Sequence, residues 1–217
     1  MGMEQIKVEL IDHMGTDLST VNSARVSFDK VKDVFDDKDE KLIKYLADHK
    51  HMTPFRHNAV QLRCHAPIFL ARQLGKHQAG LSWNEVSRRY VNSEPEFFMP
   101  DEWRGRPDGS IKQGSSGIAP ANHTLKLSYD NLVKYCEETY SDMLHLGVAP
   151  EMARMVLPQS MLTSWYWTGN LLAFAHVYKE RIAEGAQLEA QHFAKELDKV
   201  IRPLYPVSWS ALAGGEK

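Results

Sequence analysis

Hydrophobic and polar residues alternate in short stretches of the N-terminal half. Residues 5–11 (IKVELID) alternate as a half-buried strand does. Residues 59–65 place Val60, Leu62 and Cys64 on one face of a second strand, with polar side chains on the other. Residues 94–99 predict a further strand. The first half of the chain is therefore expected to supply a small sheet.

The second half follows a helical spacing instead. Apolar positions recur every three or four residues from Leu125 to Gly147, and again from Ala186 to Ile201, where Pro203 ends the helix. The stretch 103–122 is rich in Gly, Pro and Ser and predicts a long surface loop. The predicted helices cover residues 17–24, 37–49, 68–77, 125–147, 150–157, 159–181 and 186–201. This order favours the α+β class, with a sheet from the N-terminal half packed against long C-terminal helices in one compact domain, 1–217.

Composition narrows the possible functions. The 217 residues are 43% hydrophobic and 25% charged, and the formal net charge is −2. That balance gives no overall attraction to nucleic acid or to an anionic membrane, so an anionic ligand needs a local cluster of Arg and Lys. No apolar run approaches the roughly 20 residues that a membrane span requires, and the N-terminus has no signal-peptide pattern. With two cysteines and no sign of a disulfide framework, a cytoplasmic location is expected.

One segment carries an unusual density of polar residues. Residues 72–90 (RQLGKHQAGLSWNEVSRRY) combine Arg, Lys, His, Gln, Asn, Glu and Ser. A solvent-exposed helix is the plain alternative, but Gly75 and Gly80 interrupt a regular helix, and the charges lack the i, i+4 pairing of exposed helices. Arg binds phosphate oxygens in two-pronged geometry, and Asn and Gln match the edge of a pyrimidine. The segment indicates a nucleotide-like ligand without indicating a reaction.

Other candidate sites are weaker. His49, His51, His57, His65 and Cys64 do not have the spacing of a helical zinc site, so no metal is expected. Cys64 and Cys136 fall on apolar faces and are interpreted as core residues rather than nucleophiles. The run Trp165-Tyr166-Trp167 is interpreted as the buried aromatic face of a helix, although such rings also stack on flat ligands.

Asn84-Glu85-x-Ser87-x-Arg89-Tyr90 resembles the signature of flavin-dependent thymidylate synthases, in which Arg-His-Arg precedes Ser by seven residues. The resemblance covers residues 7 to 200. Further matching segments are 24–28 (ARVSF), 51–57 (HMTPFRH), 66–69 (APIF), 71–73 (ARQ), 153–158 (ARMVLP), 167–170 (WTGN), Arg181 and 186–189 (AQLE).

The resemblance implies a reaction and its partners. Such enzymes convert dUMP to dTMP with methylenetetrahydrofolate as one-carbon donor, and NADPH reduces the FAD that supplies the reducing equivalents. They need no cysteine nucleophile, which agrees with the settings of Cys64 and Cys136. They are homotetramers with active sites at subunit interfaces.

Site residues follow from the resemblance, position by position. The residues implied at the dUMP site are Gln73, Glu85, Val86, Ser87, Arg88, Arg89, Arg154 and Arg181. Those implied at FAD are Ser27, Thr53, Lys76, His77, Gln78, Glu85, Asn170 and His176. Catalytic roles are implied for Arg181, at the uracil ring, for Ser87, and for His51, beside flavin and folate. Because no base is evident for Ser87, we interpret its hydroxyl as a hydrogen-bond partner of substrate rather than a nucleophile.

The sequence departs from the family near FAD. Arg-His-Arg is replaced by Lys76-His77-Gln78, and eight residues separate Gln78 from Ser87. Leu172 replaces an Arg and Gly185 replaces a His. These changes predict that FAD is held differently, and more weakly, than in typical members. They leave two alternatives open: a dUMP-binding relative with impaired flavin chemistry, and a flavin enzyme that acts on another pyrimidine nucleotide.

Overall fold

A computed structural model describes residues 2–91, 93–107 and 114–214. Its centre is a four-stranded sheet in the order β1-β2-β6-β3, and every neighbouring pair is antiparallel. The strands are β1 (Lys7–Met14), β2 (Ala59–Pro67), β3 (Leu81–Glu85) and β6 (Leu162–Asn170). The two strands predicted from alternation, β1 and β2, are confirmed, and so is the α+β class.

Strand β6 corrects the prediction of a helix over 159–181. The helix α6 (Leu171–Ile182) occupies only the second part of that range. Trp165 and Trp167 are buried, whereas Tyr166 between them is 47% exposed, so the burial alternates with the period of a strand. A run of aromatic and β-branched residues favours a strand, and this preference outweighed the helical spacing. One of the two central strands of the sheet, β6, therefore comes from the second half of the chain.

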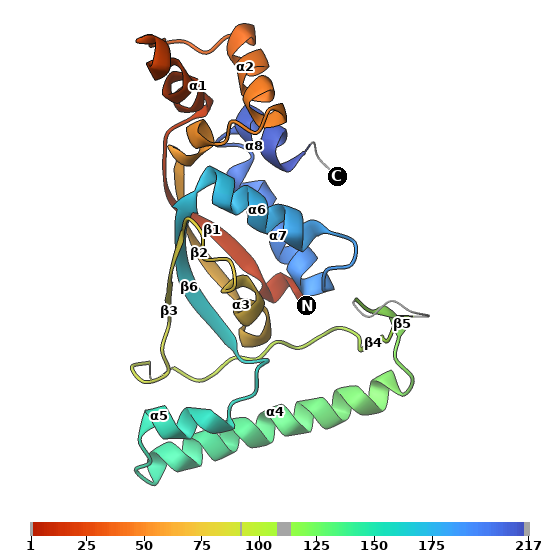
Figure 1. The fold of residues 1–217 in the computed structure, drawn as a ribbon. Coiled ribbons are helices and arrows are strands. Elements are labelled where there is room, and N and C mark those ends of the chain that lie inside the picture. The colour runs from red at the N-terminus through yellow and green to blue at the C-terminus, as the bar shows by residue number, and fades with distance from the viewer. Residues whose placement is uncertain (1, 92, 108–113, 215–217) are drawn as a thin grey trace.

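Helices cover one face of the sheet (Figure 1). Trp165 and Trp167 pack there against Phe174 of α6 and Phe193 of α7. On the opposite face, no helix of the described residues covers Tyr166, and Gln61 donates to Thr168 along the surface with an N–O distance of 3.1 Å. The remaining helices are α1 (Asp17–Arg25), α2 (Asp37–Asp48), α3 (Ile68–Leu74), α4 (Asn122–His145), α5 (Pro150–Ala153), α7 (Leu188–Ile201) and α8 (Pro206–Ala213), and the 3₁₀ turns are η1 (Met3–Gln5), η2 (Val26–Phe28), η3 (Thr53–Arg56) and η4 (Arg154–Val156).

Between β3 and β6 the chain makes a long excursion that carries α4 and α5 away from the sheet (Figure 1). The strand predicted over 94–99 is wrong: those residues make one isolated bridge, Phe97 to Met161, since Pro95 lacks an N–H to donate. The predicted loop 103–122 contains a two-stranded ribbon, β4 (Arg104–Gly105) with β5 (Ser116–Ile118). Arg104 ties this ribbon to α7 through both oxygens of the buried Glu189, at 2.7 and 2.8 Å. Residues 108–113 of the loop lie outside the described residues.

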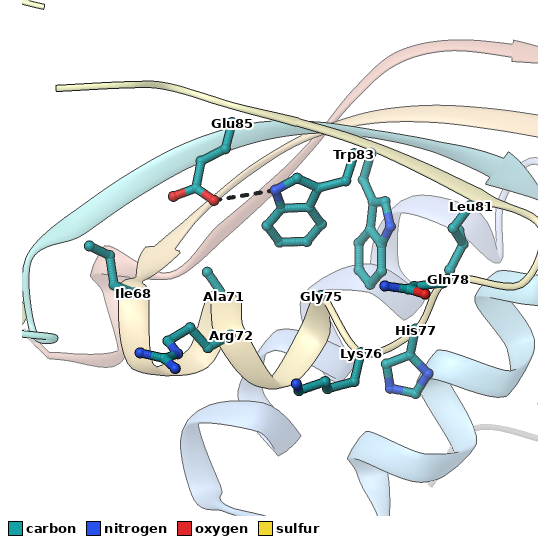
Figure 2. Close-up of a pocket in the computed structure, with 11 residues that line it drawn as sticks. Ile68, Ala71, Arg72, Gly75, Lys76, His77, Gln78, Leu81, Trp83 and Glu85 are labelled. Atoms are coloured by element: carbon teal, nitrogen blue, oxygen red, sulfur yellow. Dashed lines mark hydrogen bonds between the residues drawn. The ribbon is translucent and has the colours of Figure 1, made fainter. Parts of the chain in front are cut away.

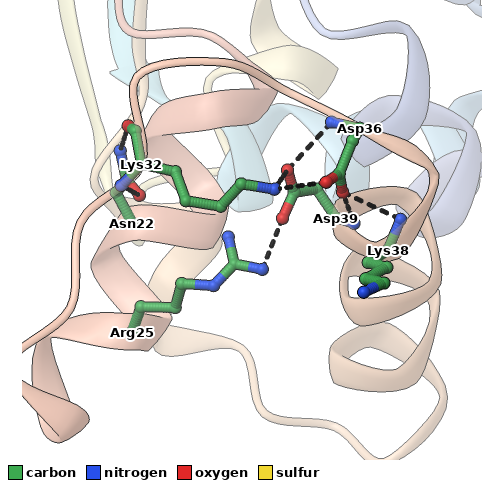
Figure 3. A network of polar contacts seen from close by, with 6 residues as sticks. All are labelled: Asn22, Arg25, Lys32, Asp36, Lys38 and Asp39. Carbon is green, nitrogen blue, oxygen red and sulfur yellow. Dashed lines mark hydrogen bonds and ion pairs between the residues drawn. The ribbon is translucent and has the colours of Figure 1, made fainter.

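A charged network joins α1 to α2 (Figure 3). The fully buried carboxylate of Asp39 pairs with Arg25 of α1 and with Lys32, whose Nζ is 2.7 Å from Asp39 and 2.7 Å from Asp36. Asp36 and Asp39 form the capping box of α2. The side-chain amide of Asn22 donates to the backbone carbonyl of Lys32 and accepts from its backbone N–H. The network fixes the turn that carries Ser27.

No helix within the described part of the chain is both long and apolar enough to cross a membrane.

Candidate functional site

The polar segment 72–90 lies along the C-terminal half of α3 and continues into β3. Together these elements line a cavity of about 650 Å³, which we call the Trp83 cavity. Three predicted FAD contacts, Lys76, His77 and Gln78, lie at one end, and Trp83 and Glu85 of β3 form a wall (Figure 2). The helix ends at Leu74, before the predicted end at 77, and Gly75 follows it. The loop beyond Gly75 turns the polar side chains of residues 76–78 to the cavity.

Glu85 is held at this wall by two donors. Its Oε1 accepts from the hydroxyl of the buried Thr163 at 2.9 Å, and its Oε2 accepts from Trp83 Nε1 at 3.3 Å (Figure 2). Trp83 is itself fixed, because its ring stacks on Trp165 with centroids 4.3 Å apart. Glu85 was predicted to contact both dUMP and FAD, and the structure gives it a defined orientation beside the cavity.

A second cavity of about 730 Å³, the Arg181 cavity, adjoins the first, with Arg72 and Lys76 common to both. It contains two predicted dUMP contacts, Gln73 and Arg181, from α3 and α6. Gln73 Nε2 donates to Gln187 Oε1 at 2.5 Å, across from α7. Cations and amides therefore meet here, as recognition of an anionic, hydrogen-bonding ligand requires.

His77 connects the two cavities through a contact that the sequence did not suggest. Arg181 Nε donates to His77 Nε2 at 3.0 Å. Burial lowers the pKa of His77, and the positive charge of Arg181 lowers it further. His77 is therefore neutral around pH 7.

A smaller cavity of about 230 Å³, the His176 cavity, contains the predicted FAD contacts Asn170 and His176. Asn170 is the N-cap of α6, since its Oδ1 accepts from the N–H of Ala173 at 2.9 Å. Gly80 has a φ of +76°, and a Cβ there would come within 2.5 Å of Asn170 Nδ2. Leu172, which replaces the usual Arg, is an apolar wall of this cavity, although Arg56 also lines it.

The other residues predicted to contact dUMP lie elsewhere in the chain. Val86 and Arg88 line a separate cavity of about 270 Å³ on the open side of the sheet, together with Arg63 and His65. Arg88 donates to the carbonyl of Glu94 at 3.1 Å, which engages it within its own loop. The exposed Arg89 reaches the Ser87 hydroxyl at 3.4 Å.

Four predicted residues lie farther away (Figure 1). Ser27 is on η2 and Thr53 on η3, at the end of the molecule that holds α1 and α2. His51 precedes Thr53 and is exposed beside the ring of Tyr45, with centroids 6.2 Å apart. Arg154 is on η4 at the opposite end, where it is exposed beside α5. A single chain does not bring these residues to the Trp83 and Arg181 cavities.

The predicted site lacked several residues that line the cavities, among them Arg72, Trp83 and Gln187. Arg72 lines both large cavities, Trp83 lines one, and Gln187 contacts Gln73. A signal for Trp83 was present in the sequence, since apolar Leu81 and Trp83 alternate with polar Ser82 and Asn84, as in a strand. Gln187 could not be found from local pattern, because it is 114 residues from its partner.

Comparison with known proteins decides the family. The family model for thymidylate synthase complementing protein matches residues 9–207. The chain belongs to the flavin-dependent thymidylate synthases. It is 38% identical over 205 residues to the flavin-dependent thymidylate synthase of Thermotoga neapolitana, covering 94% of this chain and 89% of the relative. The corresponding enzyme of Thermus thermophilus is 37% identical over 208 residues, which are 94% of this chain and 74% of the relative.

Solved structures confirm the fold of this flavin-dependent thymidylate synthase family. The UMP/dUMP methylase PolB of Streptomyces cacaoi, bound with 5-Br dUMP, superposes with a TM-score of 0.84 at 31% identity. The alignment covers 95% of this chain and 94% of that structure. Family membership makes this chain an enzyme of the thymidylate synthase class that works with a flavin.

Proposed function

We propose that this protein converts dUMP to dTMP with FAD as cofactor, methylenetetrahydrofolate as one-carbon donor and NADPH as reductant. The observation that carries the proposal is the Arg181 cavity, where Arg181 and Gln73 from two helices converge next to the cations Arg72 and Lys76. The solved relative bound with 5-Br dUMP supports the nucleotide assignment. Cys64 is buried in β2, Cys136 is partly buried on α4, and neither lines the Trp83 or Arg181 cavity, so the reaction is expected to proceed without a thiolate.

Each group of the nucleotide has a matching set of side chains. Arg181 donates to the uracil carbonyls and stabilises negative charge that develops there, as a fixed cation in a partly buried site does. The side-chain amide of Gln73 hydrogen-bonds to the edge of the uracil ring, and Gln187 orients this amide by accepting from its Nε2. Arg89 and Arg154 bind the phosphate, because a dianion needs more than one guanidinium. Ser87 donates a hydrogen bond to the nucleotide.

The Trp83 cavity fits a flavin. Lys76, His77 and Gln78 offer hydrogen-bond donors beside a fixed indole, and a flavin presents carbonyl oxygens and phosphates on a flat ring. Asn170 and His176 extend this set through the His176 cavity. When bound, FAD supplies the reducing equivalents that convert the one-carbon unit to a methyl group. His51, Ser27 and Thr53 lie at the α1–α2 end of the chain and complete the flavin and folate site of a neighbouring subunit.

The active site is composed from several subunits of a homotetramer. Arg154 is exposed on η4, directly after α5, whereas Arg181 of the same chain is on α6, and α5 and α6 lie far apart (Figure 1). Helix α4 also exposes large apolar side chains, including Leu132 at 53% and Tyr135 at 68%. Exposed apolar groups of this kind are typical of surfaces that a partner covers. Assembly thus brings Arg154 of one subunit to Arg181 of another.

The altered flavin contacts predict weak retention of FAD. Lys76 and Gln78 offer fewer forked donors than two arginines, and Leu172 is buried and apolar at a position where the family has a cation. High-salt dialysis of the purified protein is therefore expected to remove most of the FAD, measured as visible flavin absorbance per chain. Stoichiometric FAD after dialysis would contradict this prediction.

The whole proposal is tested by one assay. The protein is incubated with FAD, NADPH, methylenetetrahydrofolate and dUMP, and dTMP is measured, with parallel reactions that omit each component or replace dUMP by UMP. Formation of dTMP that requires all four is expected. If no dTMP forms at saturating FAD while dUMP still binds, the protein is a nucleotide-binding relative with impaired flavin chemistry. If methylated product forms from UMP and not from dUMP, the substrate is another pyrimidine nucleotide.

The expectations of a cytoplasmic location, and of no nucleic-acid or membrane partner, stay predictions. Localisation of a tagged chain in the host cell tests the first.

A further inference from the structure

Arg181 is held at one atom and free at the others. It lies in the last turn of α6, and its Nε–H donates to Nε2 of His77, which follows α3. Among the described residues, no hydrogen bond is made by the two terminal Nη groups of Arg181. A guanidinium offers a side-on fork, made of Nε and one Nη, and an end-on fork, made of both Nη groups. With Nε engaged, the end-on fork is the one that remains for a ligand.

The direction of this hydrogen bond fixes the protonation of His77. Because Arg181 Nε is a donor, His77 Nε2 must be the accepting nitrogen, so the ring is neutral with its proton on Nδ1. The surroundings favour that form. Burial is the largest cause that lowers the pKa of His77, and Arg181 and His176 add to it, whereas Glu180 opposes it.

We propose that neutral His77 is a positioning residue for the nucleotide: it holds the Arg181 guanidinium by Nε, so that the Nη fork meets the uracil carbonyls. This role rests on the proposed function, in which Arg181 contacts the uracil ring. Holding a long side chain in one rotamer before the ligand arrives removes an ordering cost from binding. His77 thus contributes to dUMP affinity without touching dUMP.

The proposal predicts an acid limit to dUMP binding. Protonated His77 has no lone pair for Arg181 and carries a like charge beside it, so the hydrogen bond is lost. Since the pKa of His77 is lowered from 6.5, the neutral form persists through neutral pH and the loss occurs on the acid side of that value. The dUMP phosphate also protonates near pH 6, so the effect has to be separated from the ligand's own titration.

Two substitutions at His77 make that separation. In His77→Gln, the amide oxygen reaches a similar position and accepts from Arg181, but it does not titrate. His77→Leu keeps a similar bulk and removes the acceptor. Binding of dUMP is measured by equilibrium dialysis across pH 5.5–8 at saturating FAD, with flavin content of each variant determined from its absorbance.

The expected result is a graded one. At pH 8, His77→Leu weakens dUMP binding about tenfold, while His77→Gln stays within about threefold of wild type. Toward acid, wild type loses more affinity than His77→Gln, in which only the phosphate titrates. Equal affinity of His77→Leu and wild type, or a glutamine variant as weak as the leucine variant, would overturn the proposal. If His77 only stabilised the fold, dUMP affinity of His77→Gln would fall toward acid pH as steeply as that of wild type.

Arg181→Ala separates failure of this inference from failure of the proposed function. If Arg181→Ala binds dUMP as wild type does, the placement of uracil at Arg181 is wrong, and the role of His77 is wrong with it. If Arg181→Ala loses affinity while both His77 variants keep it, the proposed function holds and only the positioning role of His77 is wrong.

Discussion

Cys64 lies in the middle of β2 with its side chain fully buried, and burial raises the pKa of its thiol. A buried thiol of raised pKa is a poor nucleophile, because the thiolate is the reactive form. Cys136 is partly buried on α4. Neither residue lines the cavities that hold Arg181 and Trp83.

A variant in which Cys64 and Cys136 are both replaced by alanine is therefore expected to form dTMP at a rate within about twofold of wild type. Its free energy of unfolding should fall by about 1–2 kcal/mol, because alanine fills the Cys64 position less completely. Assay of dTMP beside Arg181→Ala as the inactive control checks this. Loss of activity in a variant with an unchanged circular dichroism spectrum would show that a cysteine thiol takes part in the reaction.

At the level of single residues, the sequence predicted four residues that line the Trp83 cavity, one of which is Glu85. Lys76, His77 and Gln78 were expected together and line one cavity. The contact between His77 and Arg181 joins residues 104 positions apart, and no local pattern carries such a distance.

At the scale of elements, β6 shows where periodicity misleads. Trp165 and Trp167 face the core, and Tyr166 faces the open side of the sheet. A helix through the same residues would turn successive side chains by about 100°, so adjacent rings would not lie on opposite sides. The apolar spacing around this run suited a helix, but the aromatic and β-branched content suited a strand, and pairing with β2 and β3 decided the outcome.

The alternation in β6 predicts unequal costs for neighbouring aromatic residues. Trp167→Ala empties a fully buried position and should cost about 3–5 kcal/mol of unfolding free energy. Tyr166→Ala, at a half-exposed position, should cost under about 1 kcal/mol in the isolated chain. Urea denaturation measures both, with the unfolding slope as a check on the native state. Similar losses in the two variants would contradict the strand assignment.

The network between α1 and α2 gives stability a pH dependence. Burial by itself would raise the pKa of Asp39, but hydrogen bonds from Lys32, the Asp36 backbone and Arg25 outweigh it, and the net shift is downward. The hydrogen bond from Lys32 lowers the pKa of Asp36 to about 2. Groups with a lowered folded-state pKa stabilise the fold above their unfolded value of 3.8, and this contribution is lost as the pH falls through the folded value.

Asp39→Asn is therefore expected to lower the free energy of unfolding at pH 7 by about 1–3 kcal/mol, since it weakens two charged contacts. The difference from wild type should hold down to about pH 4 and shrink below it, where the wild-type carboxylates begin to take up protons. Denaturant unfolding at several pH values checks this, with the exposed Asp37→Asn as a matched control that should change little. If the difference in unfolding free energy between wild type and Asp39→Asn does not change with pH, the charge of Asp39 is not its cause.

At the scale of the whole molecule, the separation of Arg154 from Arg181 predicts complementation between subunits. Arg154→Ala and Arg181→Ala should each be nearly inactive. When the two variants are unfolded and refolded together, random assembly should give about a quarter of the sites both arginines, if each site takes them from different subunits. Activity of the mixture well above either variant, with light scattering to confirm the tetramer, is the expected result. Absence of recovery in a mixed tetramer would place both arginines in one subunit's site.

The sequence predicted the fold class because the alternation in β1 and β2 is a local pattern. It predicted a nucleotide ligand because the composition of Arg72–Tyr90 is local too. It did not predict the strand order, since β6 pairs with β3 across nearly 80 residues. Nor does a linear pattern state which distant loops meet in an assembled protein.

The pairing of β3 with β6 has a consequence for how such a chain evolves. The chain leaves the sheet at Glu85 and returns at Leu162, into a neighbouring strand. Insertions and deletions in residues 86–161 can lengthen or shorten the arm that carries Arg154 while both ends of that arm stay fixed. The predicted flavin contacts Lys76–Gln78 lie before this arm and the predicted phosphate ligand Arg154 lies within it, so a change in the length of the arm can leave the first set in place.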